Sequence, residues 1–264
     1  MSTTTTTTIA STTQPAGHAE DARPFAGVAA LITGASRGLG AALAGELGRL
    51  GARLVLVARE RGPLEAVVAE INAAGGEAHA LDADVGDKRA TYAIAGAAAA
   101  LVGPIDLLIH NASVLGPTPL RLLLDTDCED LDHVLEVNLV GPFRLTKAIA
   151  GAMAIRRRGT IVHISSDAAV TAYPRWGAYG VSKAALDHLA RSWAAELAGT
   201  GVRVLSVDPG EMNTRMHADA VPEADPASLA DPAEIAARIV RLLAQPEPLP
   251  SGARVEAAAI GGAS

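Results

Sequence analysis

One stretch of sequence decides the fold: Thr33-Gly34-Ala35-Ser36-Arg37-Gly38-Leu39-Gly40. It follows a short apolar run, 28–33, and precedes a segment, 39–50, whose leucines recur at helical spacing. Glycines at a strand-to-helix junction allow a tight turn and a close approach of the backbone to a pyrophosphate, and the amides of the helix N-terminus are ready donors for it. Such turns also occur for packing alone, but a position straight after the first strand of an alternating pattern favours phosphate binding.

Short apolar runs alternate with longer amphipathic segments from residue 28 almost to the C-terminus. Runs of five to seven residues rich in Val, Ile or Leu predict strands buried on both faces at 28–33, 54–58, 78–82, 105–109, 160–165, 202–208 and 254–260. The segments between them predict helices at 39–50, 61–74, 88–101, 128–157, 178–199 and 232–245. This alternation predicts an α/β fold, a single doubly wound domain with a seven-stranded parallel sheet flanked by helices.

The domain organisation is simple. Residues 1–24, which begin with a threonine run, have too little apolar surface to order and predict a disordered tail, and 25–264 form the one folded domain. The proline-rich segment 209–231 is longer than an ordinary connection and predicts a functional loop over a binding site.

Composition excludes several classes of protein. The net charge of −7 argues against a nucleic-acid-binding surface, and no apolar run is long enough to span a membrane. The single cysteine, Cys128, excludes an intramolecular disulfide, and the seven histidines show no metal-ligand spacing, so we expect no metal site. A single cysteine is also compatible with a reducing compartment, and we expect a cytoplasmic protein.

The spacing Thr-Gly-x3-Gly-x-Gly in residues 33–40 differs from the common Gly-x-Gly-x-x-Gly fingerprint. It resembles the cofactor loop of the short-chain dehydrogenase/reductase family, and the resemblance covers about residues 25–260. It implies a Rossmann-like fold and a nicotinamide cofactor. The cofactor contacts that it implies are Thr33, Gly34, Ser36, Arg37, Gly38, Leu39, Gly40, Arg59, Asp84, Val85, Asn111, Ala112, Tyr179, Lys183, Pro209, Gly210, Met212 and Thr214.

The end of the second strand bears on which nicotinamide cofactor binds. A site selective for NAD places a carboxylate here to accept from the ribose 2′-hydroxyl, and neither Ala58 nor Arg59 offers one, although Glu60 lies one residue further on. Arg37 and Arg59 stand where NADP-dependent family members carry basic residues, and two guanidinium groups suit a 2′-phosphate. We therefore expect NADP(H).

Other cofactor contacts follow from the resemblance alone. Asp84 and Val85 match the pair that contacts the adenine, and Thr214 matches the hydroxyl that holds the carboxamide. The fourth strand leads into His110-Asn111-Ala112-Ser113, where the family usually has Asn-Asn-Ala-Gly, so Ser113 places a hydroxyl near the mouth of the pocket.

Four residues match the catalytic tetrad of that family, in order and spacing: Asn138, Ser166, Tyr179 and Lys183. Tyr179 and Lys183 are four residues apart on one helical face, and Ser166 precedes Tyr179 by thirteen residues. The resemblance implies that Tyr179 is the general acid/base, that Ser166 orients the substrate oxygen and that Asn138 keeps a water near Lys183. We expect the Lys183 ammonium, together with an oxidised nicotinamide, to lower the pKa of the Tyr179 phenol toward neutral pH.

The substrate is less well defined by the sequence. A mostly apolar set with a few polar tips is expected to face it and suits a small-to-medium lipophilic ketone or secondary alcohol: Val114, Leu115, Ala168, Tyr173, Trp176, Met212, Met216 and His217. Ser113 and Glu211 complete the expected substrate contacts, and Glu211, Arg175 and His217 could instead recognise a polar substrate. Trp176 could stack on a ring of the substrate or pack in the core. The helices predicted at 128–157 and 178–199 resemble those that pair between subunits in the family, which predicts a homodimer or homotetramer.

The leading function is therefore an NADPH-dependent carbonyl reductase, or ketoreductase, that belongs to the oxidoreductases. Two alternatives remain: a relative that binds a dinucleotide as a sensor or scaffold without turnover, and a dehydrogenase that oxidises an alcohol physiologically.

Overall fold

All seven predicted strands pair in one parallel sheet. The computed structural model describes residues 23–260, and the strands of its sheet lie in the order β3-β2-β1-β4-β5-β6-β7. Their bounds are β1 Ala29–Thr33, β2 Arg53–Ala58, β3 Glu77–Asp82, β4 Leu107–His110, β5 Gly159–Ile164, β6 Val202–Asp208 and β7 Arg254–Glu256. The order reverses between β1 and β4, and ligands of doubly wound sheets bind at such a switch point.

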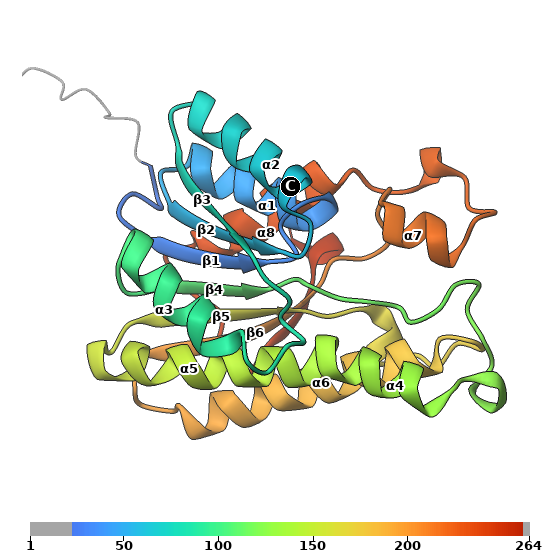
Figure 1. The fold of residues 1–264 in the computed structure, drawn as a ribbon. Helices are drawn as coiled ribbons and strands as arrows, with labels where there is room; N and C mark the ends of the chain where they lie inside the picture. The colour runs from blue at the N-terminus through green and yellow to red at the C-terminus, as the bar shows by residue number, and fades with distance from the viewer. Residues whose placement is uncertain (1–22, 261–264) are drawn as a thin grey trace, which may run out of the picture.

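The helices form a layer on each face of the sheet (Figure 1). Their bounds are α1 Gly38–Arg49, α2 Arg61–Ala73, α3 Thr91–Val102, α4 Cys128–Leu135, α5 Gly141–Arg156, α6 Gly177–Glu196, α7 Arg215–Ala220 and α8 Pro232–Leu243. One apolar cluster packs α1, α2 and α8 against the sheet, and a second packs α3, α5 and α6 against the other face.

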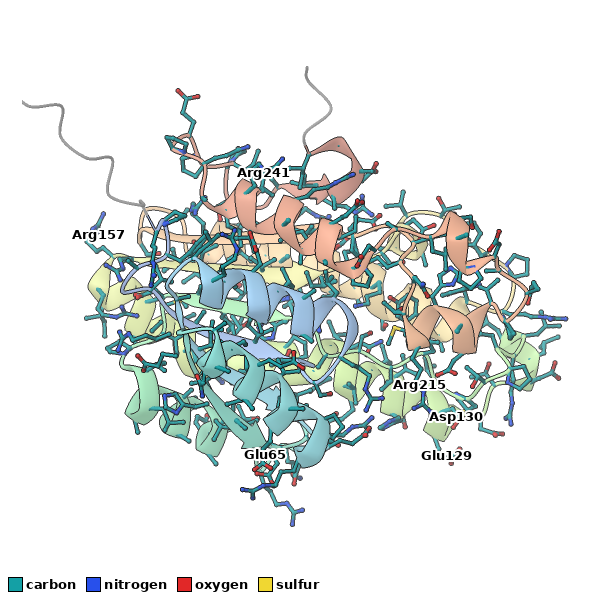
Figure 2. All side chains as sticks on the ribbon, turned by 90° about the horizontal axis from the view of Figure 1, so that it is seen from above. Glu65, Glu129, Asp130, Arg157, Arg215 and Arg241 are labelled. Atoms are coloured by element: carbon teal, nitrogen blue, oxygen red, sulfur yellow. The ribbon has the colours of Figure 1, made fainter. Side chains whose placement is uncertain are left out.

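The residues of β1 show how the two layers are built. Ala30 and Ile32 belong to the cluster with α1, whereas Ala29 and Leu31 belong to the cluster with α5, and all four are fully buried. Alternate side chains of a strand point to opposite faces, so a strand covered on both sides needs an unbroken apolar run. Charged side chains such as Glu65 and Arg157 project outward around these layers (Figure 2). The α/β fold expected from the sequence is confirmed.

The helix predicted at 128–157 is continuous from Cys128 to Arg156, but it is not α-helical throughout. Between α4 and α5, residues Glu136–Val140 form a π-helical turn, with Asn138 at its centre. Pro142 has no amide to give to the carbonyl four residues earlier, and a π-turn accommodates one extra residue at such a break.

The last predicted strand is also shorter than expected. β7 ends at Glu256, and Ala257–Ala259 form a 3-10 turn. Alanine is depleted in strands, so the alanine run does not prolong the pairing with β6.

The segment 209–231 covers the carboxyl end of the sheet, as the loop prediction required, but it contains helix α7. Its two ends pair with each other: Ala230 N–H donates to the Glu211 carbonyl, and Asn213 N–H donates to the Ala230 carbonyl at 2.9 Å. The segment is therefore closed at its base.

Two expectations concern residues beyond this range. The predicted tail, 1–24, lies outside the described residues except for Arg23 and Pro24, and so does the end of the predicted domain, residues 261–264. Within 23–260, no helix is both long and apolar enough to cross a membrane. In the same range, no three His, Cys, Asp or Glu side chains gather as they would around a metal ion.

Candidate active site

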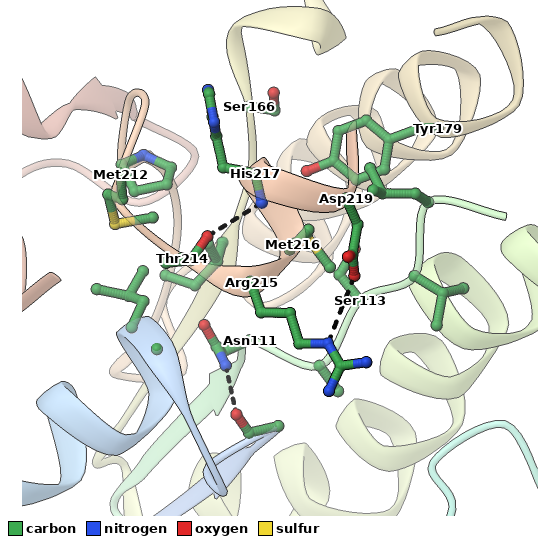
Figure 3. A pocket seen from close by; sticks show the side chains of 18 of the residues that line it. Asn111, Ser113, Ser166, Tyr179, Met212, Thr214, Arg215, Met216, His217 and Asp219 are labelled. Atoms are coloured by element: carbon green, nitrogen blue, oxygen red, sulfur yellow. Dashed lines mark hydrogen bonds and ion pairs between the residues drawn. The ribbon is translucent and has the colours of Figure 1, made fainter. Parts of the chain in front are cut away.

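A cavity of about 940 Å³ opens at the carboxyl ends of the central strands. The turn after β1, the ends of β2, β4, β5 and β6, and the segment 209–231 form its walls (Figure 3). All ten residues predicted to contact the substrate line it, as do most of the predicted cofactor contacts. Thr33, Gly40 and Asn138 are not among its lining residues.

The glycine turn is held tightly against the end of β4. Gly34 has a φ of +67°, and a Cβ there would lie 2.7 Å from the Ala112 Cα. A Cβ on Gly40 would collide with the Gly34 carbonyl oxygen. The Asn111 Nδ2 donates to the carbonyls of Thr33 and Gly34 at 3.1 and 3.0 Å, which fixes the turn. Thr33 and Gly40 therefore shape the turn from behind.

The turn suits a diphosphate. It leads directly into α1, and the Arg37 side chain at the N-terminus of α1 makes no capping hydrogen bond to the helix amides. Unpaired amides and the positive end of the helix dipole attract anions. The residues at this end of the cavity thus fit the pyrophosphate of a dinucleotide.

Three charged residues line the cavity near the end of β2: Arg37, Arg59 and Glu60. Arg37 Nη2 forms an ion pair with Glu60 Oε1, and both side chains are substantially exposed. Glu60 therefore competes for the guanidinium that we expect to hold a 2′-phosphate. This contact between residues 23 positions apart was not anticipated from the sequence.

The other predicted cofactor contacts line the cavity in ordered turns. The Asp84 Oδ1 accepts from Gly86 N–H at 2.9 Å. The Asp208 Oδ1 accepts from Gly210 N–H at 3.0 Å, and Gly210 has a φ of +73°. Thr214 caps α7 by accepting from His217 N–H at 3.2 Å (Figure 3).

Tyr179 and Lys183 lie one turn apart on α6, and both are buried. The Lys183 Nζ lies 5.5 Å from the centre of the Tyr179 ring and donates to the Ile164 carbonyl at 2.7 Å. Ser166 follows β5, and Figure 3 shows Ser166 and Tyr179 side by side at the cavity. The structure thus brings together three of the four residues that match the tetrad.

Asn138, the fourth residue that matches the tetrad, is buried and does not line the cavity. Its side chain pairs with both backbone groups of Val114, accepting from N–H at 2.8 Å and donating to C=O at 2.9 Å. It also donates to the Ser182 Oγ at 2.9 Å. Asn138 therefore joins the loop that follows β4 to helix α6.

The pKa of Tyr179 is raised in the protein alone. It lies at about 12: burial has the largest effect, the carboxylates of Asp208 and Asp167 also raise it, and the hydroxyls of Ser166 and Ser113 lower it. Burial lowers the pKa of Lys183 to about 8, against the opposing effect of Asp187 and Asp208. Desolvation of the phenolate is the largest of the effects on Tyr179. The lowering expected from Lys183 together with an oxidised nicotinamide stays a prediction.

Two buried histidines lie behind this wall. The rings of His110 and His163 stack with their centres 4.8 Å apart, and neither ring nitrogen of His163 has a hydrogen-bond partner within 23–260. Burial lowers the pKa of His163 to about 3, and that of His110 also falls well below its usual value. Both rings are neutral at physiological pH.

The substrate end of the cavity is apolar at its base and charged at its rim. Trp176 packs edge-on against Tyr179, with ring centres 5.7 Å apart, so core packing accounts for its position. Leu115 and Met216 belong to the same apolar cluster. At the rim, the His217 Nε2 lies 3.7 Å from the Glu211 Oε1.

Sequence reasoning missed Asp167. Its carboxylate accepts from the Ser166 Oγ at 2.9 Å and from the Tyr173 hydroxyl at 2.8 Å. Its place directly after the predicted serine was a signal that could have identified it. Arg215 and Asp219, which pair across one turn of α7, also line the cavity, and only the folded segment reveals them.

Comparison with known proteins agrees with this geometry. The sequence model of the short chain dehydrogenase family matches residues 28–225. The chain is 32% identical over 232 residues, 85% of its length, to glycine betaine reductase ATRR of Emericella nidulans, and it spans only 18% of that protein. It is 37% identical over 197 residues, 73% of its length, to a short chain dehydrogenase of Pseudocercospora fijiensis and spans 62% of it.

Solved structures give the same result. A metagenomic short-chain oxidoreductase in complex with NADP is 38% identical, with a TM-score of 0.74 over 86% of this chain and 96% of that one. The sheet order, the glycine turn and the match over most of the chain lead to one conclusion: the protein belongs to the short chain dehydrogenase family.

Proposed function

We propose that the protein is an NADP(H)-dependent oxidoreductase that interconverts small-to-medium lipophilic ketones and secondary alcohols, with Tyr179 as the general acid/base. One observation carries the proposal. A phenol, an ammonium and a hydroxyl, from Tyr179, Lys183 and Ser166, meet at a cavity whose other end is a glycine turn suited to a dinucleotide. A nicotinamide cofactor, when bound, supplies or accepts the hydride.

Tyr179 suits the role of acid in the direction of reduction. With a pKa of about 12 in the protein alone, its hydroxyl is protonated at neutral pH and can donate to the oxygen of a carbonyl. Ser166 orients that oxygen, and the Lys183 ammonium stabilises the phenolate left after the proton is given up. Asn138 acts indirectly, because its side chain fixes α6 against the loop after β4.

Two arguments support NADP(H). Arg37 and Arg59 both line the cavity beside the end of β2, and their planar guanidinium groups suit phosphate oxygens. A related solved structure is a complex with NADP. Against this, the carboxylate of Glu60 pairs with Arg37 and could accept from a ribose hydroxyl, which would favour NAD.

The lining residues support a lipophilic substrate. Leu115, Trp176 and Met216 form one apolar cluster with Tyr179, so the phenol that would meet the substrate oxygen is flanked by apolar side chains. An apolar base with few polar groups is typical of sites for small organic molecules. We expect the protein to work as a homodimer or homotetramer in the cytoplasm.

A panel of ketones and aldehydes, assayed by the loss of NADPH absorbance, tests the proposal. We expect turnover by the native protein and a loss of about a hundredfold or more in kcat for Tyr179→Phe, with cofactor affinity within a few-fold. Near-normal turnover by that variant would refute the role of Tyr179. Tight cofactor binding without turnover of any carbonyl or alcohol would favour a dinucleotide sensor, and turnover of alcohols alone would favour a dehydrogenase.

A further inference from the structure

Arg254, the first residue of β7, reaches under the wall that carries Tyr179, Lys183 and Ser166. Its side chain is 20% exposed and binds three groups of the fold. The Nε donates to the Asp187 Oδ2 at 3.0 Å, and the Nη2 donates both to the Asp208 Oδ2 at 2.8 Å and to the Ser166 carbonyl at 3.0 Å. A weaker contact of 3.5 Å joins the Nη1 to Glu256.

Each of the three strong partners belongs to a different part of the candidate active site. Asp187 lies one helical turn after Lys183 on α6. Asp208 ends β6, and its other carboxylate oxygen holds Gly210 N–H in the turn that lines the cavity. The third partner is the backbone of Ser166 itself. A single planar group thus connects α6, the end of β5 and the turn after β6.

Arg254 also balances charge at this point. Asp187 and Asp208 are nearly completely buried, with 5% and 7% of their side chains exposed, and the Asp187 Oδ1 has no partner among the described residues. Two buried carboxylates without a cation would be costly, and removing one partner of a buried ion pair exposes that cost.

The charges around Lys183 come from several elements. Asp187 on α6 and Asp208 on β6 raise its pKa, and the neutral His163 faces it from β5. Tyr179 lies beside it, and the Asp167 carboxylate from the turn after β5 raises the pKa of that phenol, as Asp208 does. The Arg254 guanidinium is the cation that pairs with the two carboxylates acting on Lys183.

We propose that Arg254 is a positioning residue for proton transfer: its guanidinium holds the Ser166 backbone, Asp187 and Asp208 in one arrangement and neutralises the two carboxylates next to Lys183. The β7 strand thereby contributes to the site although it provides no residue to the cavity wall. The effect on activity rests on the proposed function, but the effect on Lys183 does not.

The primary experiment measures Lys183 directly and needs neither substrate nor cofactor. The chain has only three lysines, Lys88, Lys147 and Lys183, so selective ¹³C labelling of lysine gives three Cε signals to follow against pH by NMR. In Arg254→Met we expect the pKa of Lys183 to rise from about 8 by at least about half a pH unit, because a cation is lost and two carboxylates are released. Lys88 and Lys147 should titrate as in the native protein.

Two further variants keep the test decisive where Arg254→Met folds poorly. Arg254→Lys retains the charge without the fork, so the pKa of Lys183 should stay near its native value. Arg254→Met with Asp187→Asn removes one cation and one carboxylate together, which should return the pKa of Lys183 most of the way. Arg156→Met is the matched control, because Arg156 is similarly buried and pairs with the buried Asp106 at the other end of the sheet.

Activity supplies a second measurement. We also expect a change in the pH–rate profile of alcohol oxidation. In Arg254→Met its rising limb should move to higher pH by about as much as the pKa of Lys183 rises, whereas in Arg156→Met it should not move. Absence of turnover in the native protein would count against the proposed function and leave the lysine titration as the test of Arg254. An unchanged pKa of Lys183 in folded Arg254→Met, or an equal change in Arg156→Met, would overturn the assignment.

Discussion

The hydroxyl of Ser166 donates to the carboxylate of Asp167, its neighbour in sequence, over 2.9 Å. The same hydroxyl is the one proposed to orient the substrate oxygen, so Asp167 and the substrate compete for one hydrogen. Asp167 also raises the pKa of Tyr179. A residue that no motif includes therefore acts on both groups of the proposed mechanism.

Replacement of Asp167 by Asn should make alcohol oxidation easier at moderate pH. Loss of the carboxylate lowers the pKa of Tyr179, so the phenolate forms at lower pH, and a decrease of half a unit gives about a threefold higher rate at pH 8. Rates measured from pH 7 to 9.5 check this. Tyr173→Phe is the control, because it removes a hydrogen bond to Asp167 and leaves the charge. If the rate of alcohol oxidation rises over the same pH range in Asp167→Asn as in the native protein, the expectation is contradicted.

Cofactor selectivity should depend on the pair of Arg37 and Glu60. Glu60→Gln releases the guanidinium and should tighten NADPH binding by about tenfold, whereas Arg37→Ala with Arg59→Asp should weaken it by about a hundredfold and spare NADH. Fluorescence titration with both cofactors measures each affinity. If selectivity is the same in all three proteins, the 2′-phosphate site lies elsewhere.

The glycine turn allows a matched pair of substitutions within α1. Gly40→Ala places a methyl group against the Gly34 carbonyl, so we expect a loss of about 2 kcal/mol in the free energy of unfolding and much weaker dinucleotide binding. A Cβ at Gly45 meets nothing within 4 Å, so Gly45→Ala should stabilise the protein by up to about 1 kcal/mol. Urea denaturation compares the two variants, and equal stabilities would show that the turn is looser than described.

The stacked histidines should make stability depend on pH. Between pH 6.5 and about 3 the unfolded chain binds a proton at His163 that the folded protein does not bind, so the free energy of unfolding decreases as the pH falls. His163→Leu should flatten the decrease by about 1.4 kcal/mol per pH unit between pH 5.5 and 4.5. Denaturation at several pH values measures the slope, with His79→Leu at the surface as the control. An identical slope in His163→Leu and the native protein would show that His163 is protonated in the fold.

Local pattern was enough to predict most of the fold. Each strand is an apolar run because it is covered on both faces, and the alternation with helices leaves little choice of topology. The π-helical turn inside the helix predicted at 128–157 precedes Pro142 and holds Asn138, whose side chain contacts Val114, 24 residues away. Apolar periodicity carries no information about such contacts.

In the candidate site, too, some features follow from local sequence pattern and others depend on contacts between distant residues. The turn at 33–40 and the pair of Tyr179 and Lys183 are local patterns, and the structure places them at one cavity. The pairing of Arg37 with Glu60 and of Arg254 with Asp187 joins residues that are 23 and 67 positions apart. Only the folded chain decides which charges meet, and the raised pKa of Tyr179 follows from burial that a motif does not report.

The paired backbone of Met212 and Ala230 closes the cavity-covering segment at its base. Residues 213–229 therefore join the rest of the fold at one place, and none of them belongs to a strand of the sheet. Because Met216 and His217 of this segment line the cavity, substitutions there can reshape the substrate end without altering the sheet itself.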